Sequence, residues 1–287
     1  MQFFRCSAAF IFSTDTPEQI MYATVHFMLA SSVSRQPSII SSTGEDYRAL
    51  TRVSNSDLTR LKEEHLGYWP VPSARFIPEQ TKVFGRAFHQ HLLEPETVGT
   101  VLSQLMPDML PDNPTLAPKQ ADQLDTLMRT IRQDAFCRRY LRLSERERAV
   151  LFTEPTTGVA CKARLDMVYT SSKRRNALIL DLKTTSARTQ AQFLESCYNY
   201  DYDRQAAFYL DSLCHADGHE WATTRHFRFV FIGIMKQQPH RLFAVDATSI
   251  PGFMDYGRKK YRFWLRKWRE EHETDFMSAA PAWSMSA

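Results

Sequence analysis

The sequence of 287 residues lacks the patterns of thiolate-ligated metal proteins and of membrane proteins. Its five cysteines form no CxxC pair and match no spacing used for zinc or iron–sulfur ligation. The odd number and scattered positions favour reduced thiols in a cytoplasmic protein without an iron–sulfur cluster. No apolar run approaches the roughly 20 residues that a membrane helix needs, so no membrane partner is expected.

The chain also lacks a strong excess of either charge. Its formal net charge is +4, from 36 basic and 32 acidic residues, which is compatible with nucleic-acid binding but does not indicate it. Basic residues gather instead between residues 258 and 269, interleaved with aromatics. The helical spacing of Phe253, Tyr261 and Trp264 favours a core face, and the basic residues then form a solvated face or contact duplex phosphates.

Three regions are expected along the chain. Residues 1–44 form an N-terminal extension whose apolar patch lacks the cleavage region of a signal peptide. Residues 45–276 form one domain, and residues 277–287 form a disordered tail.

Within the domain, hydrophobic periodicity predicts two blocks of helices around a cluster of strands. Helices are expected near 54–64, 79–93, 188–196 and 251–273, in one or two pieces within 119–143, and around Gln205. Strands are expected up to residue 154 and near 160–169, 176–185, 227–234 and 242–246. This order predicts an α/β protein with a central mixed β-sheet flanked by helices.

Two neighbouring strands carry charged residues where an apolar core is expected. In the strand at 176–185, three leucines alternate with Ile179, Asp181 and Lys183, so Asp181 and Lys183 share one face of the sheet. Asp166 interrupts the strand at 160–169 in the same way. Two carboxylates and a lysine on adjacent strands suggest a metal-assisted site, although Asp181 and Lys183 also fit an ion pair on an exposed sheet face.

Four further polar residues are candidates for the same site. His89 and Glu154 could serve beside the two aspartates, whose oxygens suit Mg²⁺ or Mn²⁺. Gln205 and Tyr209 lie four residues apart on one helix face, where they could position the lysine or a phosphate. Two alternatives stay open, since His91 competes with His89 and the segment around Glu154 also fits an ordinary turn. Gly85, one helical turn before His89, would allow close backbone approach there.

The order of these residues resembles the PD-(D/E)xK nuclease superfamily, across about residues 53–245. Asp166 followed by Asp181-Leu-Lys183 is similar to its signature. Gln205-Ala-Ala-Phe-Tyr209 resembles the QxxxY motif of the RecB-like and exonuclease VIII branch, and Gly85-Arg-Ala-Phe-His89 resembles the helix that contributes a histidine there. The resemblance implies a restriction-endonuclease-like core.

The resemblance also implies an activity and roles for the residues. It implies a metal-dependent DNA exonuclease of the phage or mobile-element type, acting in recombination or repair on ends of linear double-stranded DNA. Such enzymes work with a single-strand annealing protein, and a ring-shaped homo-oligomer would fit. By matched motif, the implied metal ligands are Asp166, Asp181, the Leu182 carbonyl, His89 and Glu154.

Lys183 would be the catalytic lysine, with Gln205 and Tyr209 assisting it. The metal would be Mg²⁺, although an imidazole ligand makes Mn²⁺ activity plausible. Two other functions remain open. The first is a catalytically silent DNA-binding or scaffolding module with the same fold, and the second is another RecB-like repair nuclease without an iron–sulfur cluster.

Overall fold

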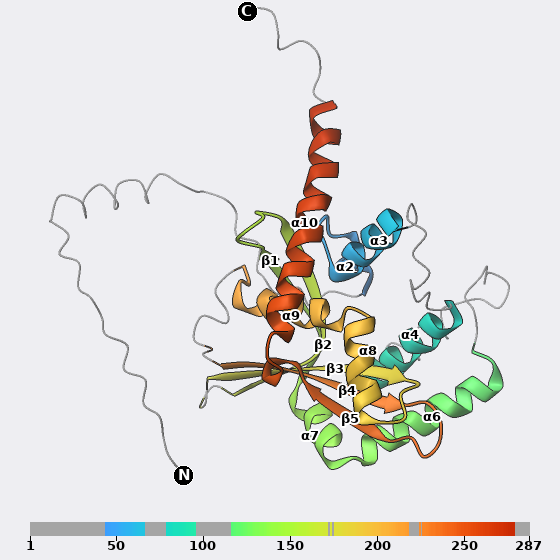
Figure 1. Ribbon diagram of the computed structural model, residues 1–287. Helices are drawn as coiled ribbons and strands as arrows, with labels where there is room; N and C mark the ends of the chain where they lie inside the picture. The colour runs from blue at the N-terminus through green and yellow to red at the C-terminus, as the bar shows by residue number, and fades with distance from the viewer. Residues whose placement is uncertain are drawn as a thin grey trace, which may run out of the picture. The chain divides into compact units, whose positions relative to one another are not determined.

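The computed structural model describes residues 44–66, 79–95, 116–171, 173, 175–217, 224 and 226–278, and the structural statements below refer to these residues (Figure 1). They contain a five-stranded sheet in the order β1-β2-β3-β4-β5. The strands are β1 (Glu145–Thr153), β2 (Ala160–Ser171), β3 (Asn176–Thr185), β4 (His226–Met235) and β5 (Leu242–Asp246). Because β3 and β4 are parallel and the other neighbours antiparallel, the predicted central mixed sheet is confirmed.

Helices precede and follow the first three strands. They are α2 (Gly44–Ala49), α3 (Asn55–Leu66), α4 (Glu79–Leu93), α6 (Pro118–Gln133), α7 (Ala135–Leu143), α8 (Gln190–Asn199), α9 (Tyr202–Cys214), the 3-10 turn η1 (Ala247–Ser249) and α10 (Phe253–Ser278). The segment 119–143 forms two helices because Asp134 is extended and its carboxylate caps α7, accepting from the Cys137 N–H at 2.8 Å. Within the described ranges, no helix is both long enough and apolar enough to cross a membrane.

The predicted end regions fall almost wholly outside the described residues. The extension at 1–44 contributes only Gly44, the first residue of α2, and the tail at 277–287 contributes only the last two residues of α10.

Alternation along β3 sends neighbouring side chains to opposite layers of core. Leu180 and Leu182 are buried with residues of α4, α6 and α7, whereas Ile179 is buried with residues of α8, α9 and α10. The sheet therefore has helices on both faces (Figure 1). Burying each of these aliphatic side chains contributes roughly 1.5–3 kcal/mol, so both faces hold the sheet in place.

The basic and aromatic helix α10 is mainly a packing element. Tyr261 is fully buried, as its helical spacing predicted. Several of its basic residues are engaged within the chain; among them, Arg258 pairs with Asp211 at 2.9 Å, and Arg262 pairs with Glu154 at 2.9 Å. These two arginines therefore anchor α10 to the rest of the domain and are not simply a solvated face.

Candidate metal and catalytic site

The site lies where β2 and β3 separate. The ladder between these strands runs from Ser171↔Asn176 to Met167↔Leu180. The next residues in register are Asp166 on β2 and Asp181 on β3. At this point the backbone N–H of Leu182 donates to Asp166 Oδ2 at 2.8 Å, so a carboxylate takes the place of a strand partner. The separation of the strands thus brings both acids into one gap.

A local irregularity in β1 and β2 aims a third acid at the same place. Residues two apart in a regular strand share a face, yet Leu165 packs in the layer of α8 and α9 while Met167 packs in that of α4 and α6. Across the hairpin, Glu147 lies opposite Asp166 and has a φ of 50°. Such a conformation costs about 1–3 kcal/mol for a non-glycine residue and often occurs at functional sites. The irregular backbone at Glu147 on β1 and at Asp166 on β2 brings the carboxylates of these two residues close together.

His89 completes this group from α4. Its Nδ1 lies 3.2 Å from Asp166 Oδ2, and ligand atoms of His89, Glu147 and Asp166 lie within 4.8 Å of one another. In the part of the chain that the structure describes, this is the one such cluster of potential metal ligands. Carboxylate oxygens with a single imidazole suit Mg²⁺ or Mn²⁺, and a cation there would offset the repulsion between Glu147 and Asp166. The donor set therefore fits a divalent metal.

Burial and neighbouring charges shift the pKa values of all three side chains in this group. Burial together with the charge of Asp166 raises the pKa of Glu147 to about 7, although Arg164 Nε lies 2.8 Å from its carboxylate. Burial alone would lower the pKa of His89, but the neighbouring Asp166 carboxylate outweighs it and the net shift is upward. Burial would raise the pKa of Asp166, but His89 and Lys183 lower it.

Asp181 and Lys183 form a second, deeper group. Asp181 is 1% exposed, and Lys183 Nζ lies 2.7 Å and 2.6 Å from its two oxygens. Gln205 Nε2 donates to Asp181 Oδ1 at 3.0 Å, and the Tyr202 ring centroid lies 5.0 Å from Lys183 Nζ. The pair is therefore buried in a network, and the alternative of an exposed surface ion pair is wrong.

The charges of this pair follow from its burial. Burial raises the pKa of Asp181 to about 6 against the pull of Lys183. Burial would lower the pKa of Lys183, but the charge of Asp181 outweighs it and raises that pKa above its ordinary value. Lys183 is therefore a cation at neutral pH.

Tyr209 lies behind Gln205. Burial raises the pKa of its hydroxyl, and the Gln205 side chain is hydrogen-bonded to it. Its ring packs 6.4 Å from Phe208 and 6.4 Å from Phe229, centroid to centroid. Tyr209 thus supports the side chain of Gln205, which in turn donates to Asp181.

The prediction that Glu154 completes the metal shell is wrong. Its Oε2 accepts from the backbone N–H of Thr156 at 3.1 Å and of Thr157 at 2.7 Å, and its Oε1 accepts from Arg262 Nε at 2.9 Å. It lies seven residues beyond Glu147, which corresponds to about 23 Å along an extended strand. Glu154 therefore connects the β1–β2 turn to α10 through hydrogen bonds, in agreement with the alternative that the segment around it is an ordinary turn.

The third acid, Glu147, was missed although a signal for it existed. It stands in the run Glu145-Arg-Glu-Arg148, ahead of the apolar part of β1. The hairpin turn pairs Thr153 with Ala160, and counting back six residues from Thr153 reaches the position opposite Asp166. Register, rather than composition, identifies it.

The reason proposed for Gly85 is also wrong. A Cβ atom built at Gly85 would meet no atom within 4 Å, so no close approach requires glycine there. The choice of His89 over His91 rests instead on the contact between His89 and Asp166.

Comparisons with known proteins agree with this fold. A family model described as "PDDEXK-like domain of unknown function (DUF3799)" matches residues 60–275. The crystal structure of a candidate exonuclease from Eubacterium rectale has a TM-score of 0.51 and 13% identity, covering 79% of this chain and 84% of that chain; at this identity the likeness concerns the fold alone. The structure of SSO0001, with 14% identity over 72% of this chain and 84% of that one, has a TM-score of 0.27, too low to support an argument. No curated protein matches the sequence.

Proposed function

We infer the function from the family and from the site together. This chain belongs to the PDDEXK-like family, whose model matches residues 60–275. We propose that it is a divalent-metal-dependent nuclease that hydrolyses phosphodiester bonds in linear double-stranded DNA, starting from the ends. The observation that carries the proposal is the gap between β2 and β3, where Asp166, Asp181 and Lys183 are brought to the His89 side chain of α4. A silent binding module would not need this combination of buried charges.

The chain's own residues would hold the metal as follows. His89, Glu147 and Asp166 each offer one ligand atom, a nitrogen and two carboxylate oxygens, and these atoms lie within 4.8 Å of one another. The N–H and C=O of one strand residue point to the same side, so the Leu182 carbonyl is available on the side where its N–H meets Asp166. A bound Mg²⁺ or Mn²⁺ would supply Lewis-acid activation of water and neutralise charge on the phosphodiester.

The deeper group supplies positive charge and position. Because its pKa is raised, Lys183 keeps its proton and donates hydrogen bonds to an attacking water or a phosphate oxygen. Asp181 holds the ammonium in place, and Gln205 orients Asp181 by donating to Oδ1. Preorganised in this way, the ammonium offsets negative charge that develops on the phosphate without rearrangement.

The test is hydrolysis of linear and covalently closed circular duplex DNA by the purified protein in Mg²⁺, Mn²⁺ or EDTA. We expect degradation of the linear duplex only, dependent on metal, and its loss in Lys183→Met. Degradation of the closed circle would refute end dependence but keep the nuclease. Metal-independent binding without hydrolysis of either DNA by the wild-type protein would refute the enzyme and favour the silent module.

A further inference from the structure

One guanidinium group beside the metal group contacts acids from two other elements. Arg164 lies on β2, and its Nε is 2.8 Å from Glu147 Oε2 on β1. Its Nη2 donates at 2.5 Å to Oε1 of Glu94, the residue that directly follows α4. The proposed hydrolysis assigns a role to neither Arg164 nor Glu94.

The three elements that Arg164 connects are the same three that carry the metal group. His89 is on α4, Glu147 on β1 and Asp166 on β2. Arg164 precedes Asp166 by two residues, and the intervening Leu165 is buried on the other side of the sheet, among residues of α8 and α9. Arg164 therefore shares the face of β2 from which Asp166 meets His89. A single side chain joins all three sources of ligand atoms.

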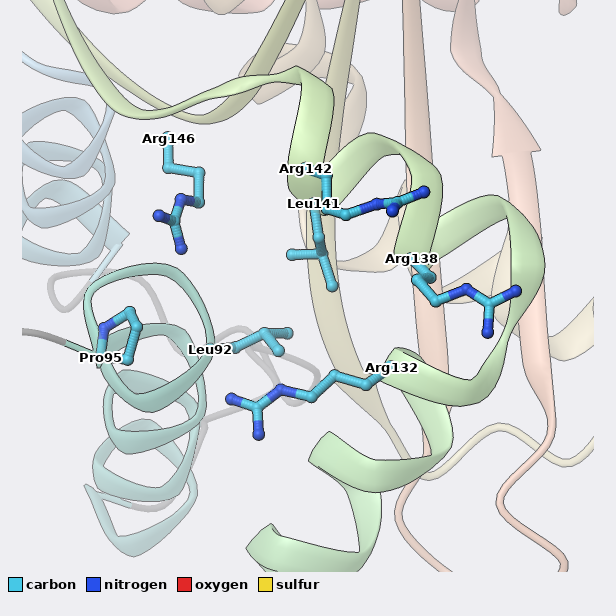
Figure 2. A pocket seen from close by; sticks show the side chains of 7 residues that line it. All are labelled: Leu92, Pro95, Arg132, Arg138, Leu141, Arg142 and Arg146. Atoms are coloured by element: carbon cyan, nitrogen blue, oxygen red, sulfur yellow. The ribbon is translucent and has the colours of Figure 1, made fainter.

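The end of α4 and the start of β1 border a cavity with a volume of about 180 Å³. Figure 2 shows Pro95 and Arg146 among the side chains around this space. Pro95 directly follows Glu94, and Arg146 directly precedes Glu147. Since close packing does not fill the space beside the two acids, the contacts of Arg164 connect them directly.

The ligand positions need such support. Glu147 has a φ of 50°, a strained conformation that persists only where the surrounding structure holds it. A metal site needs its ligands within about 0.5 Å of the productive geometry. The donors of a guanidinium are fixed in one plane, so binding two carboxylates through Nε and Nη2 also sets the distance between them. A lysine, with one ammonium on a flexible chain, cannot do the same.

We propose that Arg164 is a positioning residue that holds His89, Glu147 and Asp166 in their metal-binding arrangement, and the proposal rests on the metal-dependent nuclease function inferred above. The charge of Arg164 and its position then act in opposite directions on a divalent cation. As a positive charge, Arg164 repels the metal. As a bridge, it keeps the ligands in place. Removing the side chain therefore separates the two effects by the sign of the change in metal affinity.

The experiment measures Mn²⁺ binding to the full chain without DNA, from the electron paramagnetic resonance signal of free Mn²⁺. Arg164→Met keeps a long side chain without the charge, and Arg164→Lys keeps the charge without the planar fork. The matched control is Arg52→Met. Arg52 pairs with Asp217 at 2.9 Å and its side chain is 27% exposed, against 22% for Arg164, but its partner carboxylate does not belong to the metal group. Hydrolysis of a linear duplex is measured on the same preparations.

We expect Arg164→Met to weaken Mn²⁺ binding by about 10–100-fold, the usual effect of losing an outer partner of a metal ligand. This loss occurs although removing a positive charge would by itself strengthen binding. Arg164→Lys should fall between wild type and Arg164→Met. Arg52→Met should lower the thermal unfolding temperature in EDTA without a change in Mn²⁺ affinity. Glu94→Gln should weaken binding in the wild-type background but not in Arg164→Met, because it acts through Arg164.

Unchanged or tighter Mn²⁺ binding in Arg164→Met would overturn the proposal and leave Arg164 as an ordinary ion-pair residue. An equal loss in Arg52→Met would also overturn it, because the stability of the hairpin as a whole would then set the affinity. If Arg164→Met does not unfold cooperatively, Arg164→Lys decides, and binding equal to that of wild type overturns the proposal.

Failure of the nuclease function has a different result. Wild-type protein that binds Mn²⁺ without hydrolysing DNA, combined with a selective loss of binding in Arg164→Met, would refute the nuclease and keep the positioning role. Wild-type protein that hydrolyses DNA, combined with full Mn²⁺ affinity in Arg164→Met, would refute the positioning role alone. Wild-type protein that binds no Mn²⁺ would refute both.

Discussion

Exchanging Glu147 or Glu154 for glutamine should have opposite consequences. Each substitution replaces one carboxylate oxygen by an amide nitrogen and removes one negative charge, within β1 for Glu147 and directly after β1 for Glu154. We expect Glu147→Gln to lose metal binding and hydrolysis while the fold stays at least as stable. We expect Glu154→Gln to destabilise the fold and leave the metal group intact.

The magnitude for Glu147 follows from its environment. Burial and the charge of Asp166 raise its pKa to about 7, against about 4.3 in an unfolded chain. Because the folded pKa is raised, the ionised group opposes folding above the unfolded pKa, and the penalty reaches an upper limit of roughly 3 kcal/mol at pH 7. The substitution removes this penalty but also the ion pair with Arg164. The free energy of unfolding in EDTA should therefore stay unchanged or rise modestly.

The magnitude for Glu154 has the opposite sign. The residue is 0% exposed, and its carboxylate accepts from two backbone N–H groups and from Arg262. Hydrogen bonds to a charged group contribute about 1.5–3 kcal/mol each. An amide keeps one acceptor oxygen but leaves Arg262, whose side chain is 30% exposed, without its counter-charge. We expect a loss of about 3 kcal/mol, which lowers Tm by roughly 6–12 °C in a domain of this size.

Thermal unfolding in EDTA and in Mn²⁺, together with hydrolysis of a labelled linear duplex at 25 °C, measures both effects. Mn²⁺ should raise the Tm of wild type and of Glu154→Gln. The same increase should be absent or much smaller in Glu147→Gln, because losing a ligand weakens metal binding by at least about 10–100-fold. If Glu147→Gln keeps its Mn²⁺-dependent Tm increase and hydrolysis while Glu154→Gln loses both, the assignment of the third acid fails.

Three further outcomes are expected. Lys183→Met should slow hydrolysis by about 10²–10³-fold in single-turnover assays, and retained activity would contradict its electrostatic role. Gly257→Ala should lower the free energy of unfolding by about 3 kcal/mol or more in urea titrations, because the new Cβ would lie 2.0 Å from the Asp203 carbonyl oxygen. The matched Gly85→Ala, with nothing within 4 Å of its Cβ, should stabilise by about 1 kcal/mol. Burial would raise the pKa of Glu154, but its hydrogen bonds to Thr157 and Arg262 lower it overall. The stability gap between wild type and Glu154→Gln should therefore be complete above about pH 4.3 and shrink as the pH falls through the lowered folded pKa of Glu154, and a gap that widens on acidification would contradict this.

Much of the fold could be predicted because its signals are local. Side chains alternate along a strand with period two, so Asp181 and Lys183 are assigned to one face without knowledge of the strand partners. Residues four apart on a helix share a face, which is why Gln205 and Tyr209 were paired correctly. Such relations depend only on backbone geometry within a few residues.

Contacts between distant segments could not be derived in this way. The choice between Glu147 and Glu154 depends on the register of a hairpin and on one residue with a φ of 50°. Gly85 was misjudged for the same reason, since an open surface and a tight contact have the same local sequence.

The sequence by itself determined the elements, the α/β class and the inner acids Asp166 and Asp181 with Lys183, because periodicity and strand neighbours follow from local backbone geometry. Only the tertiary structure decided that the strands separate at these acids and that Glu147 joins His89 there. Those features depend on strand register and on packing between distant segments. A shift of the register by one residue would move a side chain to the opposite face of the sheet.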